Sequence, residues 1–240
     1  MTVGKPLQPR DRLMVALDVP DVAEAEALVR KLGDSVGFFK IGLQLVFAGG
    51  LPFAEKLAKE GRNVFLDVKL LDIGNTVGKA VESIAALGVR LATVHAYPQA
   101  MRAAVVARAH KPLGLLGVTV LTSMDQDDFA AAGYSGPITD RVVARAIAAL
   151  EMGMDGVVAS PSEIGAIRQA VGRGLAIVTP GIRPKGGDVG DQKRVATAED
   201  AIAAGADYLV VGRPITAAAD PRRAAESLAE EIAAGMERRG

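Results

Sequence analysis

The densest group of ionisable side chains in this chain lies in the segment VFLDVKLLDIGNT. Asp67 and Lys69 are separated by one position, and residues two apart on a strand point to the same face. Opposite charges placed together at the end of a strand keep each other ionised. Asp72 follows just beyond, and Lys40 and Asp18 lie at or near the ends of two earlier apolar runs. The pattern predicts one site with alternating acidic and basic groups, an arrangement that is concentrated at functional sites.

Structural roles are the alternative for several polar residues. The charged residues could form ion pairs that only fill the open end of the domain, although buried ion pairs stabilise proteins weakly. Asp18 could cap the start of a helix, and Thr122 and Ser123 could cap a helix that begins near Asp125. A lone histidine lacks the partners of a metal ligand or a base, so we expect His95 to be a hydrogen-bonded group behind the site.

A second group of residues has the composition of a phosphate site. The segments PGIR and VGRPI each follow an apolar run and end near Arg183 and Arg213. Glycine lets a backbone N–H approach an anion, a helix N-terminus attracts it, and arginine binds it through two parallel hydrogen bonds. Gly212 and Arg213 are therefore predicted to bind phosphate, with Arg183 nearby and Gln192 as a neutral donor. A surface position for Arg213 before the last helix is the alternative.

Eight short apolar runs alternate with longer amphipathic segments along the chain. Such runs are typical of buried parallel strands, and we expect strands at 13–18, 38–41, 63–69, 91–95, 114–121, 156–159, 176–179 and 208–211. The segments between them predict helices at 21–32, 53–60, 75–87, 141–152, 161–171, 197–204 and 217–234.

The spacing of these elements indicates the fold. Eight strand–helix repeats in 240 residues give a mean period of about 30 residues, which suits right-handed βαβ units. The sequence predicts an α/β fold, a (β/α)8 TIM barrel that forms a single domain over residues 1–240, with its chemistry at the carboxyl ends of the strands. Arg62 and Asp207 are expected to be loop charges at the opposite ends. A doubly wound open sheet is the rival, but its glycine-rich dinucleotide motif is absent.

Composition excludes several classes of function. The chain has no Cys and two His, so thiol catalysis and Cys-based zinc sites are excluded and a His-rich metal site is not expected. The 28 basic and 28 acidic residues give zero net charge, which argues against a nucleic-acid interface. The longest apolar run, 113–121, is too short to span a bilayer, and the first residues lack the core of a signal peptide. We expect a cytoplasmic protein that binds neither membranes nor nucleic acid.

The motifs taken together resemble one enzyme family. The segment DVKLLDIGNT resembles the D-x-K-x-x-D-I-x-N-T signature of the orotidine 5′-phosphate decarboxylases. The family's other motifs also occur in the family's order, namely VALD and FKIG before this segment and VTVLTSM, VTPGIRP, GDQ and VGRPI after it. The D-x-K-x-x-D core alone is shared with related sugar-phosphate decarboxylases, whereas the full combination is highly specific. The resemblance covers nearly the whole chain. Leu71 and Gly74 stand where the commonest family pattern has His and Pro, and neither position carries the charge chemistry.

The resemblance implies an enzyme that converts orotidine 5′-monophosphate (OMP) to UMP and CO2 as the last step of de novo UMP synthesis. It implies no metal, no organic cofactor and no covalent intermediate. Lys69 is then expected to stabilise and protonate the carbanion left at C6, with Asp67 beside the departing carboxylate. Lys40 would bridge the ribose hydroxyls and the carboxylates, and Asp18 would hold a ribose hydroxyl.

The resemblance also implies an obligate homodimer with two shared sites, in which Asp72 and Thr76 reach into the active site of the second subunit. Ile73, which follows Asp72, belongs to the same substrate-binding set. The remaining contacts to the pyrimidine and the phosphate would come from Thr122, Ser123, Arg183, Gln192, Gly212 and Arg213.

Two other functions fit parts of the pattern. A Mg²⁺-dependent sugar-phosphate decarboxylase or lyase of the same superfamily would keep the D-x-K-x-x-D core and recruit further carboxylates for the metal. A catalytically silent barrel that only binds nucleotides would have no need for the opposed charges of Lys40, Asp67, Lys69 and Asp72. Turnover of OMP in excess EDTA distinguishes the three functions.

Overall fold

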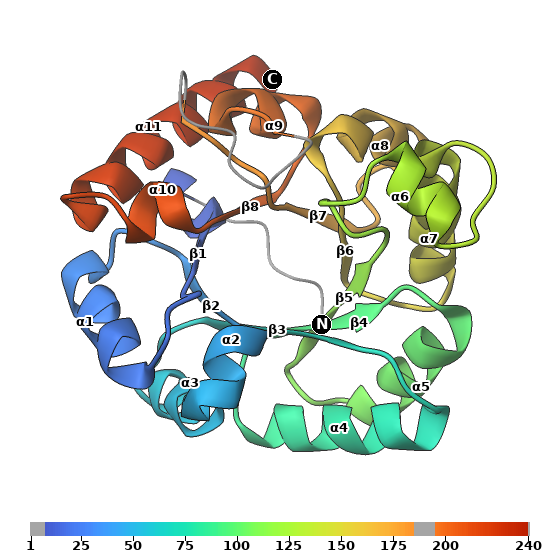
Figure 1. The fold of residues 1–240 in the computed structure, drawn as a ribbon, viewed down its shortest axis with the longest axis horizontal. Helices are drawn as coiled ribbons and strands as arrows, with labels where there is room; N and C mark the ends of the chain where they lie inside the picture. The colour runs from blue at the N-terminus through green and yellow to red at the C-terminus, as the bar shows by residue number, and fades with distance from the viewer. Residues whose placement is uncertain (1–7, 185–194, 240) are drawn as a thin grey trace.

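The computed structural model describes residues 8–184 and 195–239, and within them eight parallel strands close into a barrel. Each strand pairs with its neighbours in chain order, and β1 closes the barrel by pairing with β8 (Figure 1). The strands are β1 (Leu13–Ala16), β2 (Phe38–Gly42), β3 (Val64–Leu70), β4 (Leu91–His95), β5 (Gly114–Val118), β6 (Gly156–Val158), β7 (Ala176–Thr179) and β8 (Tyr208–Val211). All eight predicted strands are present, and the predicted TIM barrel is confirmed.

Helices form a ring around the barrel (Figure 1). The larger ones are α1 (Val22–Leu32), α3 (Leu51–Lys59), α4 (Gly74–Ala86), α5 (Pro98–Arg108), α6 (Gln126–Ala131), α7 (Ile138–Glu151), α8 (Ile164–Val171), α9 (Ala198–Ala204) and α11 (Pro221–Arg239). Shorter helical segments are η1 (Pro9–Arg12), α2 (Leu43–Leu45), η2 (Val46–Gly50), η3 (Pro161–Glu163) and α10 (Arg213–Thr216). No helix in the described part of the chain is long and apolar enough to cross a membrane.

Helix α5 was not predicted, and its composition explains the omission. The buried face of α5 consists of Ala100, Met101 and Ala104, and alanine contributes little contrast to an amphipathic pattern. Where caps are explicit, the prediction is accurate. Thr197 accepts a hydrogen bond from the Asp200 N–H at the start of α9, and Gly205 ends that helix in the left-handed region at φ 118°.

The barrel interior is apolar toward the amino ends of its strands. Inward-pointing side chains pack there into a cluster separate from the larger core between the barrel and the helices, namely Met14, Phe38, Phe65, Leu91, Leu116, Val178 and Tyr208. Two residues further along each strand, the inward positions of β2, β3 and β4 carry Lys40, Asp67 and Thr93. A packed floor thus supports polar groups at the carboxyl ends, where barrel enzymes bind their substrates.

As the sequence predicted, Asp207 lies in a loop at the amino end of a strand, directly before β8, and there it joins a network of hydrogen bonds and ion pairs. It accepts hydrogen bonds from the guanidinium of Arg168 and from the Ile177 N–H (2.9 Å), and Arg239 lies 3.5 Å away. Asp155 has a similar role before β6, where its carboxylate accepts hydrogen bonds from the guanidinium of Arg108 and from the Leu115 N–H. These carboxylates hold neighbouring strands and helices together at the end of the barrel away from the predicted site.

Candidate active site

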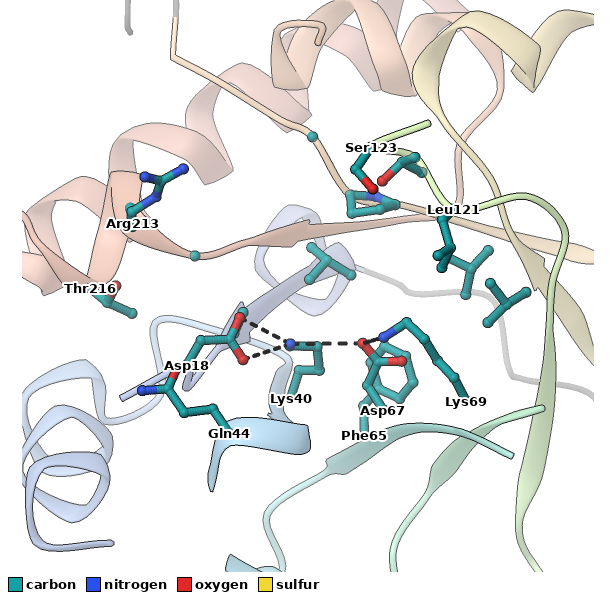
Figure 2. Close-up of a pocket in the computed structure, with 18 of the residues that line it drawn as sticks. Asp18, Lys40, Gln44, Phe65, Asp67, Lys69, Leu121, Ser123, Arg213 and Thr216 are labelled. Carbon is teal, nitrogen blue, oxygen red and sulfur yellow. Dashed lines mark hydrogen bonds and ion pairs between the residues drawn. The ribbon is translucent and has the colours of Figure 1, made fainter. Parts of the chain in front are cut away.

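A cavity of 540 Å³ opens at the carboxyl ends of the strands. Every strand except β4, or the loop that follows it, contributes lining residues among those described. Figure 2 shows Lys69 and Arg213 on opposite sides of the cavity, with Asp18 and Lys40 between them. The charge cluster and the predicted phosphate site therefore belong to one cavity.

Four charged side chains from three adjacent strands form a row of alternating sign (Figure 2). Lys40 Nζ lies 2.9 Å from Asp18 Oδ1 and 3.8 Å from Asp67 Oδ2, and Lys69 Nζ lies 2.8 Å from the same Asp67 oxygen. The Lys40 side chain is 8% exposed and that of Asp67 15%, whereas those of Lys69 and Asp18 are 31% and 48% exposed. The row thus runs from a buried centre to two solvent-facing ends.

Gly42 makes room for this row. A Cβ at this position would lie 3.0 Å from both Asp18 Oδ1 and Lys40 Nζ, closer than nearly all such contacts in proteins. Any larger residue would therefore push these two side chains apart. Asp18 is not a helix cap, because Asp21 accepts the capping hydrogen bond from the Glu24 N–H at the start of α1.

The charges of the row decide the protonation of Asp67. Burial alone would raise the pKa of Asp67, but the charges of Lys40 and Lys69, with hydrogen bonds from Lys69 and Thr93, outweigh it and hold the pKa below its usual value. Asp67 is therefore an anion at neutral pH.

His95 is a neutral ring at the same pH. Burial and the positive charges of Lys69 and Arg145 lower its pKa. His95 is half-buried beside Tyr97 and does not line the cavity.

The strand that carries Asp67 and Lys69 is not regular. Leu66 pairs with Ala92 and Leu70 with Val94, so three residues of β3 lie opposite the single residue Thr93 of β4. Lys69 adopts φ 50°, a left-handed conformation that is uncommon outside glycine. The expectation that Asp67 and Lys69 share a face is confirmed, but Lys69 reaches it through a bulge and not through simple alternation.

The opposite end of the cavity contains the predicted anion-binding residues. Gly212 and Arg213 lie where β8 passes into α10, and Gly181 and Arg183 follow β7. Gln192 lies outside the described residues. Thr122 and Ser123 line the cavity after β5, and neither caps α6, because Asp125 does.

Three predicted residues do not line this cavity. Asp72, Ile73 and Thr76 lie on the surface at and just before the start of α4, and Ile73 is 71% exposed. Leu71, in the same loop, is also exposed, as are Leu43 and Phe47 after the neighbouring strand β2. This group borders the mouth of the cavity without entering it.

Sequence reasoning missed three polar residues of the site. Gln44 and Thr216 line the cavity, and Thr93 lies behind Asp67. Thr216 follows Arg213 by three residues on α10, so helical spacing could have found it, whereas Gln44 lies on the short helix α2 just after the strand that carries Lys40. Thr93 is two residues from His95 on a predicted strand, and that period of two was the available signal.

These features define a barrel protein whose mouth combines a row of alternating charges with the residues predicted to bind an anion. The family model described as "Orotidine 5'-phosphate decarboxylase / HUMPS family" matches residues 11–228. The chain belongs to this family, and the expectation of a carboxy-lyase is confirmed. Among the described residues, no group of three or more His, Asp or Glu side chains could hold a metal ion.

Similar proteins cover almost the full chain. The orotidine 5′-phosphate decarboxylase of Rhodopseudomonas palustris (strain BisB5) is 59% identical over 224 residues, which are 93% of this chain and 95% of that protein. That of Methylobacterium nodulans is 58% identical over 94% of this chain and 97% of its own length. The crystal structure of orotidine 5′-phosphate decarboxylase from Lactobacillus acidophilus is 35% identical with a TM-score of 0.81, covering 92% of this chain and 98% of that one.

The lowered pKa of Asp67 predicts a pH effect on stability. A carboxylate whose folded pKa lies below its unfolded value of about 3.9 stabilises the protein above that pH, and this contribution is lost as pH falls through the folded pKa. We expect the difference in unfolding free energy between the wild type and Asp67→Asn to shrink as pH falls from 5 to below 4. Urea unfolding at each pH measures it, and a difference that grows with acidity would contradict the assignment.

Proposed function

We propose that the protein decarboxylates OMP to UMP and CO2 with its own side chains as the only catalytic groups. The observation that carries this proposal is the presence of the Asp18–Lys40–Asp67–Lys69 row in the same cavity as Arg213. Membership of the decarboxylase family supports the reaction type and the substrate.

The reaction requires stabilisation of charge at one carbon. When the bond from C6 to the carboxylate breaks, CO2 leaves and the electron pair stays on C6. The Lys69 ammonium stabilises this carbanion and then transfers a proton from Nζ to C6, after which solvent reprotonates the amine. Asp67, 2.8 Å from Nζ, holds the Lys69 ammonium in place before substrate binds. Such fixed charges reorganise little during the reaction, which is the basis of electrostatic catalysis.

The rest of the nucleotide extends away from Lys69. Lys40 and Asp18 are placed to hold the ribose hydroxyls, and Thr122 and Ser123 to contact the pyrimidine. We assign the phosphate to Arg213 and the Gly212 N–H, with Arg183 and Gln192 nearby. Phosphate contacts are remote from the reacting bond, so their binding energy can serve to orient the base.

We further propose a homodimer with shared active sites. Asp72, Ile73 and Thr76 border the mouth but do not line the cavity of their own chain. The exposed apolar side chains on the same two loops favour a protein interface there, formed by Leu43, Phe47, Leu71 and Ile73. A two-fold axis through this surface would carry Asp72 and Thr76 of each subunit to the site of the other.

Replacement of Lys69 tests the mechanism. Lys69→Ala is expected to fold normally, because the side chain is partly exposed, and to lose at least about 1,000-fold in kcat, since both charge stabilisation and the proton donor are removed. The assay follows the loss of OMP ultraviolet absorbance, with circular dichroism as the control for folding. Substantial turnover by the variant would remove Lys69 from this role.

The same assay in excess EDTA separates the main rival. A decarboxylase that relies on its own side chains keeps its full rate, whereas a Mg²⁺-dependent lyase loses it and recovers when Mg²⁺ is restored. Tight binding of UMP without any turnover of OMP would instead favour a nucleotide-binding barrel.

Mixed dimers test the shared site. Lys69→Ala and Asp72→Asn subunits are each expected to form weakly active homodimers. Random exchange of equal amounts should restore about a quarter of wild-type activity, because half of the dimers are mixed and each has one intact site. Lys69→Ala mixed with Asp67→Asn is the matched control and should restore none, since both residues belong to the same chain's site. Equal activity from the two mixtures would contradict shared sites.

A further inference from the structure

Thr93 lies on β4, and its side chain hydrogen-bonds to Asp67 of the charged row from the side away from the cavity. Its side chain is fully buried and lines no part of the cavity. Its position is set by the irregular pairing of β3 with β4, in which it alone lies opposite the bulged segment that carries Asp67 and Lys69. A substrate in the cavity would meet Asp67 and Lys69 and not Thr93.

A single hydroxyl group connects both residues of the pair. Thr93 Oγ1 accepts a hydrogen bond from the Lys69 N–H at 2.9 Å and donates one to Asp67 Oδ1, also at 2.9 Å. A hydroxyl has one proton to donate and lone pairs to accept, so one atom can make both contacts at once. A valine of nearly the same shape could make neither.

The first of these hydrogen bonds supports a strained backbone. Because β3 is bulged at this point, the Lys69 N–H donates to the Thr93 side chain in place of a regular strand partner. The left-handed conformation of Lys69 is itself unfavourable and persists only when its surroundings fix it. Loss of the acceptor would leave the part-buried N–H of that strained residue without this hydrogen bond.

The second hydrogen bond fixes the rotation of the carboxylate. With Oδ1 bound to Thr93, Oδ2 is the oxygen that faces Lys69 Nζ at 2.8 Å and Lys40 Nζ at 3.8 Å. The two oxygens thus have different partners, and the carboxylate has one preferred orientation.

From these contacts we infer that Thr93 is a positioning residue, whose hydroxyl holds the Asp67 carboxylate and the Lys69 backbone in the geometry that catalysis needs. The inference rests on the proposed function, in which Lys69 and Asp67 carry the chemistry. It predicts an effect on turnover that is separate from substrate binding, because the phosphate residues lie at the other end of the cavity.

Substitution of the hydroxyl tests the inference. Thr93→Val is expected to lower kcat about 10- to 100-fold, the range for loss of a hydrogen bond to a charged group. KM for OMP and the dissociation constant for UMP should change by less than about threefold, as expected when an interaction specific to the transition state is lost. Thr93→Ser keeps the hydroxyl and should recover most of kcat. Thr179→Val is the matched control, because Thr179 is equally buried and its hydroxyl has no partner among the described residues.

Two kinetic results would overturn the inference. A wild-type kcat in Thr93→Val would show that the hydroxyl is not needed, and equal losses in the valine and serine variants would show that restoring the hydroxyl does not restore activity. Thermal unfolding of each variant shows whether the protein is folded at the assay temperature.

A second measurement does not depend on turnover and so separates this inference from the proposed function. Removal of the Thr93 donor should raise the pKa of Asp67, measured by ¹³C NMR of the carboxyl carbon, while Lys40, Lys69 and His95 still face it. An unchanged pKa would overturn the positioning role. Absence of OMP turnover by the wild type would instead overturn the proposed function and leave this measurement valid.

Discussion

The contact between Lys69 and Asp67 is the interaction on which the rest of the site depends. In the proposed mechanism the ammonium that stabilises the carbanion must be fixed before the substrate arrives, and a carboxylate 2.8 Å away holds it in place. The same carboxylate is buried, which would favour its neutral form if Lys40 did not lie on its other side. The row therefore functions as a unit, because the charges of Lys40 and Lys69 keep Asp67 ionised and Asp67 holds both ammonium groups in place.

The barrel supplies the rigidity that this unit requires. Closely packed residues such as Phe65 and Leu91 fill the interior below the row, and ion pairs at Asp155 and Asp207 join the strands at the far end. Above these residues, the proposed reacting end and the proposed phosphate end of the cavity are built on different strands, β3 and β8. Separate placement allows phosphate binding to orient a substrate without disturbing the charges that act on it.

Much of this arrangement could be predicted from the sequence. Continuous apolar runs located the eight strands, and a period of two placed Asp67 and Lys69 on one face. The bulge at Lys69 could not be predicted, because it depends on the pairing of β3 with β4 and not on local preference. The period of two could have placed Thr93 on the inward face of its strand, but not its hydrogen bonds to Asp67 and Lys69, which depend on the same pairing. The structure of a single chain predicts no role for Asp72 and Thr76. Only the family resemblance assigns them one.

The most direct test of the central claim is a crystal structure of the protein with a UMP analogue substituted at C6. The account predicts Lys69 Nζ within hydrogen-bonding distance of the C6 substituent, Asp67 still bound to Lys69 and Thr93, and the phosphate on Arg213. A complex with the pyrimidine turned away from Lys69, or with the phosphate bound outside the cavity that Arg213 lines, would contradict it.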